Sequence, residues 1–156
     1  KYMDLQNTPD YIALHKSDAI DNNDVYSWNV PQSYFTSARG NKCYVSLVEC
    51  VISDGNDGDL VVKYHGGANA NNTKNDGSVI GTLCLSTSAA NPKYSYNSAA
   101  NVELLINARP SVITLSVSDI ANATLGLTNA VFVLKFTYLD PETSNMDYSN
   151  TLYQKL

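Results

Sequence analysis

The stretch KCYVSLVECVISDGNDGDLVVKYHGG, from Lys42 to Gly67, decides the fold class. Two runs rich in valine, 43–52 and 59–65, flank a cluster of Asp, Asn and Gly. β-Branched residues favour strands, and Asp-Gly steps favour tight turns because their residues tolerate positive φ. The stretch therefore predicts two strands that fold back on each other through a turn at DGNDGD, residues 54–59.

A calcium loop is the competing interpretation of DGNDGD. A loop of the EF type supplies oxygen ligands from its first, third and fifth positions and needs glycine at its sixth. When Asp54 is counted as the first position, the fifth is Gly58 and the sixth is Asp59. Because this register is wrong for calcium, we predict a turn without bound metal.

The strand before this turn has two apolar faces. Strict alternation places Val45, Leu47 and Val51 on one face and Tyr44, Val48, Cys50 and Ile52 on the other. Such a strand is covered on both sides, or is covered on one side by another subunit. Cys43 and Cys50 are seven residues apart, so alternation predicts that they point to opposite faces and do not pair.

The rest of the chain repeats this β pattern. We expect seven to nine strands, at Val25–Val30, Cys43–Ile52, Asp59–His65, Val79–Leu85, Val102–Ile106, Val112–Val117 and Ala130–Tyr138, with weaker candidates at Ser33–Thr36 and Lys93–Tyr96. Short helical turns are expected at Ser17–Asp24 or Ser118–Asn122, and no segment of 12 residues keeps a helical apolar period. The pattern predicts an all-β fold, an antiparallel β-sandwich that forms a single jelly roll of about eight strands in two four-stranded sheets. Residues 1–156 are expected to form this single domain, with polar terminal arms at about 1–10 and 140–156.

The composition bounds the partners. The chain has 156 residues, of which 44% are hydrophobic and 16% charged, as in a folded domain. The net charge of -5 and the scattered basic residues argue against specific nucleic-acid binding. No apolar run approaches the ~20 residues of a membrane helix, so no membrane insertion is expected. Three cysteines do not make a disulfide framework, and we expect buried free thiols.

Residues for catalysis or for cofactor binding are hard to find in the sequence. His15 and His65 are the two histidines, and neither belongs to a cupin-like metal set. His65-Gly66-Gly67 is similar to the oxyanion-hole loop of esterases, but no Gly-x-Ser-x-Gly elbow accompanies it. There is no Cys-x-x-Cys pair and no phosphate loop before a helix. We therefore expect no enzymatic activity, no cofactor and no metal.

Two features suggest a surface for contact. Trp28, Tyr34 and Phe35 cluster near Pro31, where they serve as core, as a subunit interface or as a platform for a sugar ring. Glu49 lies in an otherwise apolar strand, either as a hydrogen-bonded structural acid or as a residue that faces an interface. The candidate subunit interface is therefore Trp28, Tyr34, Phe35 and Glu49.

Three stretches carry a resemblance to a known family: Tyr44–Cys50, Arg109–Asp119 and Phe132–Tyr138. They are similar to the early, penultimate and closing strands of the single jelly-roll penton or minor capsid proteins of double-jelly-roll viruses, such as virophages and Polinton-like viruses. The resemblance implies a structural capsid protein, most simply the penton, which forms a homopentamer at the icosahedral fivefold axes. It also implies a virion location after assembly inside the host cell, with the major capsid protein as neighbour.

Other functions stay open at this stage. The main alternative is a carbohydrate- or receptor-binding β-sandwich module, similar to a lectin or an adhesin, that uses aromatic residues in its loops. A metal-dependent β-barrel enzyme is a further alternative, weakened because the two histidines are far apart in the sequence.

Overall fold

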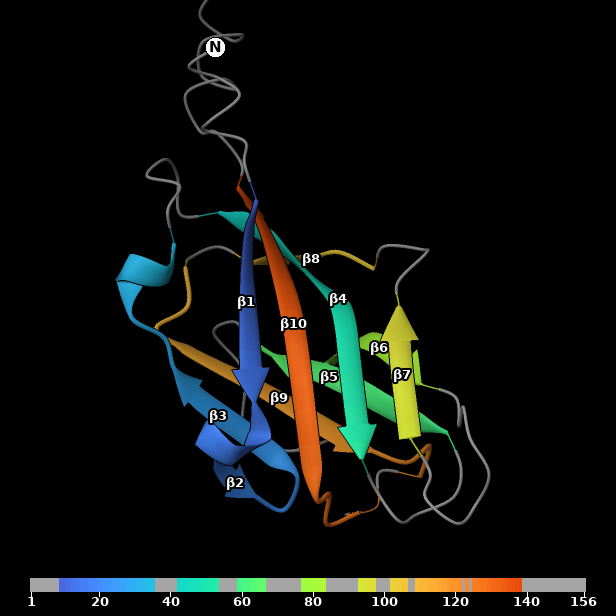
Figure 1. Ribbon diagram of the computed structural model, residues 1–156. Coiled ribbons are helices and arrows are strands. Elements are labelled where there is room, and N and C mark those ends of the chain that lie inside the picture. Colours follow the sequence, from blue (N-terminus) through green and yellow to red (C-terminus); the bar gives the residue numbers. More distant parts are fainter. Residues whose placement is uncertain are drawn as a thin grey trace, which may run out of the picture.

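The computed structural model describes residues 9–35, 42–53, 59–66, 77–83, 93–97, 102–106, 109–121, 123 and 125–138, and within these ranges the chain forms ten strands and two short 3-10 helices (Figure 1). The strands are β1 (Asp10–His15), β2 (Ile20–Asn22), β3 (Val25–Asn29), β4 (Cys43–Ser53), β5 (Leu60–His65), β6 (Ser78–Leu83), β7 (Lys93–Asn97), β8 (Leu104–Ile106), β9 (Val112–Ser118) and β10 (Asn129–Tyr138). The 3-10 helices are η1 (Lys16–Asp18) and η2 (Gln32–Tyr34).

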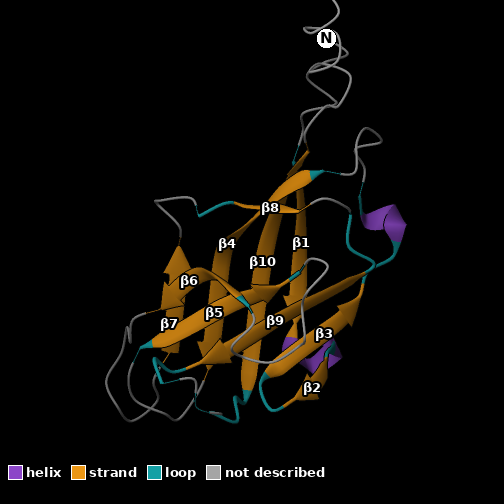
Figure 2. Ribbon diagram, turned by 180° about the vertical axis from the view of Figure 1, so that it is seen from behind, coloured by secondary structure: helices purple, strands orange, loops and turns teal. Residues whose placement is uncertain are grey.

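The strands form two antiparallel five-stranded sheets that pack face to face (Figures 1 and 2). The β4 sheet has the order β1-β10-β4-β7, with β8 also paired to β4, and the β9 sheet has the order β2-β3-β9-β5-β6. The pairs are nested along the chain: β5 with β6, β4 with β7 and β8, β3 with β9, and β1 with β10. This nesting is the strand order of a jelly roll, and it confirms the predicted fold class.

The ten strands correspond to the eight expected, with two additions. One strand position is divided into β7 and β8, which pair with opposite ends of β4. The second addition, β2, forms a hairpin with β3 and widens the β9 sheet at its edge. Each sheet therefore has five strands where the sequence predicted four.

The two strands of the opening stretch do not pair with each other. β4 belongs to one sheet and β5 to the other, so the expectation that they fold back on each other as neighbours is wrong. Residues 54–58 lie outside the described residues, and a turn without metal there stays a prediction. The strong turn signal predicted the reversal but not the sheet to which each strand belongs.

A β-bulge in β4 corrects the predicted faces of that strand. Val133 of β10 lies opposite Glu49, while the next residue, Leu134, lies opposite Leu47, so Val48 is the extra residue. The bulge shifts the alternation by one position. Val45, Leu47, Cys50 and Ile52 are consequently all buried in the core, whereas Glu49 and Val51 are exposed on the other face. Cys43 and Cys50 therefore do not point to opposite faces as predicted, and both are buried free thiols.

Aromatic rings fill the space between the sheets. Trp28 and Phe132 pack edge to face with ring centroids 5.9 Å apart, and Tyr26 lies 6.1 Å from Trp28. Phe35 packs edge to face on Phe136 at 5.3 Å. The Trp28–Phe132 pair joins β3 of one sheet to β10 of the other, and the Phe35–Phe136 pair joins the segment after η2 to β10. Edge-to-face pairs add to the stabilisation from burial.

Two parts of the chain differ from the sequence prediction near the N-terminus. β1 was not predicted and begins within the expected polar arm; its Asp10, Ile12 and Leu14 are buried. The run DYIALH is too short for its alternation to indicate a strand. The expected strand at Ser33–Thr36 is instead η2 as far as Tyr34, whose N–H donates to the carbonyl of Pro31 at 3.0 Å.

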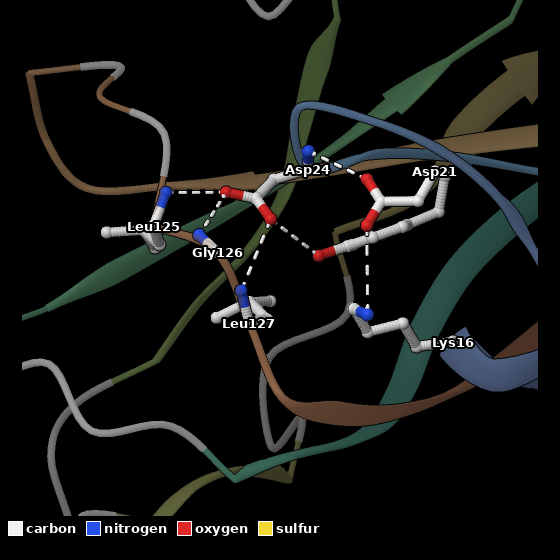
Figure 3. Close-up of polar contacts among 7 residues, drawn as sticks. Lys16, Asp21, Asp24, Leu125, Gly126 and Leu127 are labelled. Atoms are coloured by element: carbon white, nitrogen blue, oxygen red, sulfur yellow. Dashed lines mark hydrogen bonds and ion pairs between the residues drawn. The ribbon is translucent and has the colours of Figure 1, made fainter.

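The β2–β3 turn holds a buried carboxylate. Asn23 and Asp24 are the two turn residues, with φ of 53° and 65°, the left-handed conformation that a two-residue hairpin turn requires and that Asn and Asp tolerate. The Asp24 carboxylate accepts hydrogen bonds from the N–H groups of Leu125, Gly126 and Leu127 at 2.5, 2.9 and 3.3 Å (Figure 3), and from the Tyr26 hydroxyl at 2.9 Å.

These donors decide the charge state of Asp24. Burial by itself would raise the pKa of this carboxyl group, but the backbone N–H groups of residues 125–127 and the Tyr26 hydroxyl together hold the pKa below its ordinary value of 3.8. Asp24 is therefore ionised at neutral pH. Its main-chain carbonyl also accepts the Val117 N–H at 3.1 Å, so one residue contacts β9 and the segment that enters β10.

We expect Asp24→Asn to lower the free energy of unfolding at pH 7 by about 2–4 kcal/mol, because the amide keeps the shape but loses charge-assisted bonds to buried donors. Since the pKa of Asp24 is lowered in the folded state, the wild-type advantage is complete above the ordinary pKa of 3.8 and is lost as the pH falls through the lowered folded pKa. Urea unfolding of both proteins between pH 7 and pH 3 measures this. Asp21→Asn is the control: it removes the ion pair with Lys16 Nζ at 3.7 Å but keeps a side-chain oxygen that can accept the Asp24 N–H, 3.0 Å from Asp21 Oδ1, and it should cost less than about 1 kcal/mol.

We expect Cys43 and Cys50 to resist alkylation in the folded protein. Burial raises the pKa of the Cys43 thiol to about 11 and raises that of Cys50 further, so about a thousandth of Cys43 is thiolate at pH 8. Iodoacetamide labelling followed by peptide mass mapping resolves each cysteine, with urea-unfolded protein as the control. Labelling of either thiol at the unfolded rate without urea would contradict its burial.

Candidate functional site

The structure separates the four residues of the predicted interface into two pairs. Trp28 and Phe35 are core residues of the subunit itself, 5% and 6% exposed. Tyr34 is 55% exposed on η2, and Glu49 is exposed on the outer face of the β4 sheet. The prediction of a subunit interface therefore now concerns Tyr34 and Glu49, because Trp28 and Phe35 are buried inside the subunit.

A groove of about 330 Å³ lies where β1, the edge strand of the β4 sheet, faces the end of β3. Its lining includes Ala13, His15, Asp18, Trp28, Asn29 and Tyr34. The Trp28 indole N–H donates to the main-chain carbonyl of His15 at 2.8 Å and so joins the two walls. The sequence placed Trp28 and Tyr34 together but missed His15, Asp18 and Asn29, because the pairing of β1 and the packing of the sheets bring these residues into one place.

The segment that carries Tyr34 is anchored on both sides. The Val30 N–H donates to the Ser111 carbonyl at 2.8 Å, and the Gln32 amide donates to the Pro110 carbonyl at 3.4 Å. After Tyr34, Phe35 is buried against Phe136. The backbone of η2 is thus fixed, and the exposed Tyr34 ring stands at the side of the groove.

The outer face of the β4 sheet is apolar on the β10 side of Glu49, whereas register places Asn97 of β7 on the other side. Register places Glu49 beside Val133 of β10, and the next outward residue, Val51, beside Val131. Val51 is 43% exposed, and the exposed Leu105 of β8 lies farther along the sheet, opposite Tyr44. An exposed valine beside the partly exposed valines of β10 is a candidate contact for a partner.

A serine–histidine pair lies on the β9 sheet, where no sequence motif indicated it. His65 Nε2 lies 2.7 Å from the Ser116 hydroxyl oxygen, and the Cβ position of Gly77 is close enough to the His65 ring that a side chain there would clash. Distance alone would suit a nucleophile and its base. Both side chains are buried, however, so a substrate carbonyl cannot reach the Ser116 hydroxyl, and we regard the pair as a structural hydrogen bond.

The neighbouring hydroxyl groups follow the same pattern. Thr114, Ser116 and Ser118 alternate with the core residues of β9 and are buried on its other side. Thr114 Oγ1 lies 3.0 Å from the Ser27 hydroxyl oxygen of β3. These contacts are cross-strand polar pairs that fix register rather than a site open to a substrate.

Where β1 begins and β10 ends, the Tyr138 hydroxyl donates a hydrogen bond of 2.6 Å to the Asp10 carboxylate. Burial and this hydrogen bond raise the pKa of Tyr138, so its hydroxyl keeps its proton and remains a donor. The Arg109 guanidinium lies 5.6 Å from the centre of the Tyr138 ring. The hydrogen bond between Tyr138 and Asp10 thus connects β10 to β1 in addition to the backbone hydrogen bonds between these strands.

The described residues hold neither a metal-ligand cluster nor a helix that could cross a membrane. They contain no group of three or more His, Cys, Asp and Glu side chains that could hold a metal ion. Among the same residues, no helix has the length and apolar character that a membrane crossing requires.

Comparison with known proteins gives little. No family model matches the sequence, and no curated protein matches it. Among solved structures, the virus-like particle of extra small virus from the giant freshwater prawn Macrobrachium rosenbergii matches over 83% of this chain and 77% of that chain, at 9% identity and a TM-score of 0.34. Similarity at this level carries no argument, and the fold assignment rests on the strand order of the chain itself.

Proposed function

We propose that this chain is a structural viral capsid protein, a penton that forms a homopentamer at the icosahedral fivefold vertices. The observation that carries the proposal is the nested jelly-roll strand order, which joins the three stretches of capsid-like sequence in β4, β9 and β10. The sequence resemblance assigns these three strands to the early, penultimate and closing strands of a penton. The major capsid protein is the proposed neighbour, and the virion the proposed location.

The chemistry of the described residues supports a structural role. The serine and histidine that meet at 2.7 Å are buried, and no metal-binding group is found among the described residues. We propose no enzymatic activity for the chain.

The outer face of the β4 sheet is the proposed contact surface of the ring. It offers exposed Val51 beside Glu49, on a strand that the bulge bends. A ring is built from head-to-tail contacts, so this face must meet a different surface of the next copy. We expect each contact to bury roughly 800 Å² per partner, as specific interfaces do.

We predict that purified particles contain about 60 copies of this chain, five at each vertex. Quantitative mass spectrometry of particles gives the number, and cryo-electron microscopy gives the place. Particles that carry the chain away from the fivefold axes, or a chain that never enters particles, would defeat the penton proposal.

We also predict that Val51→Lys lowers incorporation into particles severalfold, because burying a lysine ammonium group at a contact costs desolvation that a neighbouring carboxylate offsets only in part. The matched control is Val79→Lys on β6, since Val79 is 48% exposed in a strand of the other sheet. Melting temperatures of the isolated variants establish that both fold. Equal incorporation of the two variants would exclude the β4-sheet face as the contact.

A further inference from the structure

We infer that the groove between β1 and β3 binds a neutral saccharide, with one sugar ring stacked on Tyr34 and its hydroxyl groups bound by Asn29 and Asp18. The inference is independent of the capsid proposal, because it concerns a different surface from the face around Glu49. The chemistry and shape of the groove carry it.

The size and lining of the groove suit a small polar ligand. A volume of about 330 Å³ is at the lower end of the range for ligand pockets, which run from ~300 to ~1,000 Å³, and holds one or two sugar rings. The carboxylate of Asp18 and the amide of Asn29 are both exposed and both line the groove. A carboxylate accepts from hydroxyl groups, and an amide both donates and accepts, so the two side chains match a pair of neighbouring hydroxyl groups on a sugar.

Tyr34 supplies the apolar half of the site. The face of its ring is electron-rich, and the C–H groups on one face of a sugar carry partial positive charge, so the two surfaces attract. Its 55% exposure is not needed by the fold, because Phe35 beside it provides the core contact. The backbone hydrogen bonds of η2 and of Val30 hold the main chain that carries Tyr34 in place before a ligand arrives, so that only the side chain of Tyr34 remains to be ordered on binding.

The charge of the groove selects a neutral ligand. Among the described residues that line it, Asp18 is the one acidic side chain, His15 is the one histidine, and none is lysine or arginine. The nearby Lys16 is directed elsewhere, since its ammonium lies 3.7 Å from Asp21 and 5.7 Å from the centre of the Tyr26 ring. A sialylated or sulfated sugar would place its anion near the Asp18 carboxylate without a lysine or arginine in the lining to offset it. A cationic ligand needs a cage of several exposed rings, and Trp28 is only 5% exposed.

The test uses the full chain and ligand-observed saturation-transfer NMR. The probes are neutral oligosaccharides that end in glucose, galactose, mannose or N-acetylglucosamine, their sialylated counterparts, and choline. We expect saturable binding of at least one neutral probe and no binding of the sialylated probes or of choline. Tyr34→Ala and Asn29→Ala should each weaken binding by about tenfold, which is the loss of one good contact.

Tyr11→Ala is the matched control. Tyr11 is 60% exposed on β1, but it does not line the groove, so this variant should bind as the wild type does. All three substituted side chains are exposed, and unchanged melting temperatures will establish that the variants fold.

Several results would overturn the inference. These are the absence of binding by every neutral probe, equal binding by wild type and Tyr34→Ala, and binding of choline or sialylated probes alone. Light scattering tests for a further contradicting result, in which the wild type forms an assembly that binds no sugar and Tyr34→Ala dissociates it. In that case the groove receives a second copy of the chain. Incorporation into particles is measured separately, so loss of sugar binding leaves the capsid proposal intact.

Discussion

The Asp24 carboxylate is the constraint on which the arrangement of the two sheets depends. It is buried in the turn that opens β3 of one sheet, and it binds the three N–H groups that precede β10 of the other. Gly126, at φ of 67°, adopts the left-handed conformation in that segment, which lets consecutive N–H groups converge on one carboxylate. The interaction joins residues about a hundred positions apart, and it closes the end of the sandwich at which Trp28 and Phe132 pack.

Sequence reasoning predicted the strands whose apolar character is strongest, and it predicted the jelly roll from their spacing. It failed where a local pattern is weaker than a tertiary contact. β1 was not predicted because its six residues alternate only briefly next to a polar segment, and because their burial depends on pairing with β10. The faces of β4 were wrong beyond Val48, because a bulge depends on the partner strand and leaves no mark in the composition.

The residues of the groove were also predicted only in part from the sequence. Aromatic clustering near Pro31 was visible in the sequence, but two of the three rings proved to be core, and alternation could not distinguish them from the exposed Tyr34. Asp18 and Asn29 looked like ordinary polar residues at the ends of short elements. Their proximity arises because η1 follows β1 and reverses the chain into the β2–β3 hairpin, which returns Asn29 to the side of the same edge strand.

The outermost pair of strands, β1 and β10, brings the first and the last strand of the sandwich together. β1 begins at Asp10 and β10 ends at Tyr138, and these two side chains are hydrogen-bonded, so the chain enters and leaves the sandwich at one corner (Figure 1). The subunit therefore has a pole. Rotational symmetry preserves direction along its axis, so in any closed ring of this chain every such corner has the same height along that axis. A label attached where β1 begins or where β10 ends would lie at that level in every copy, and one such label would suffice to determine the ring's orientation in a larger particle.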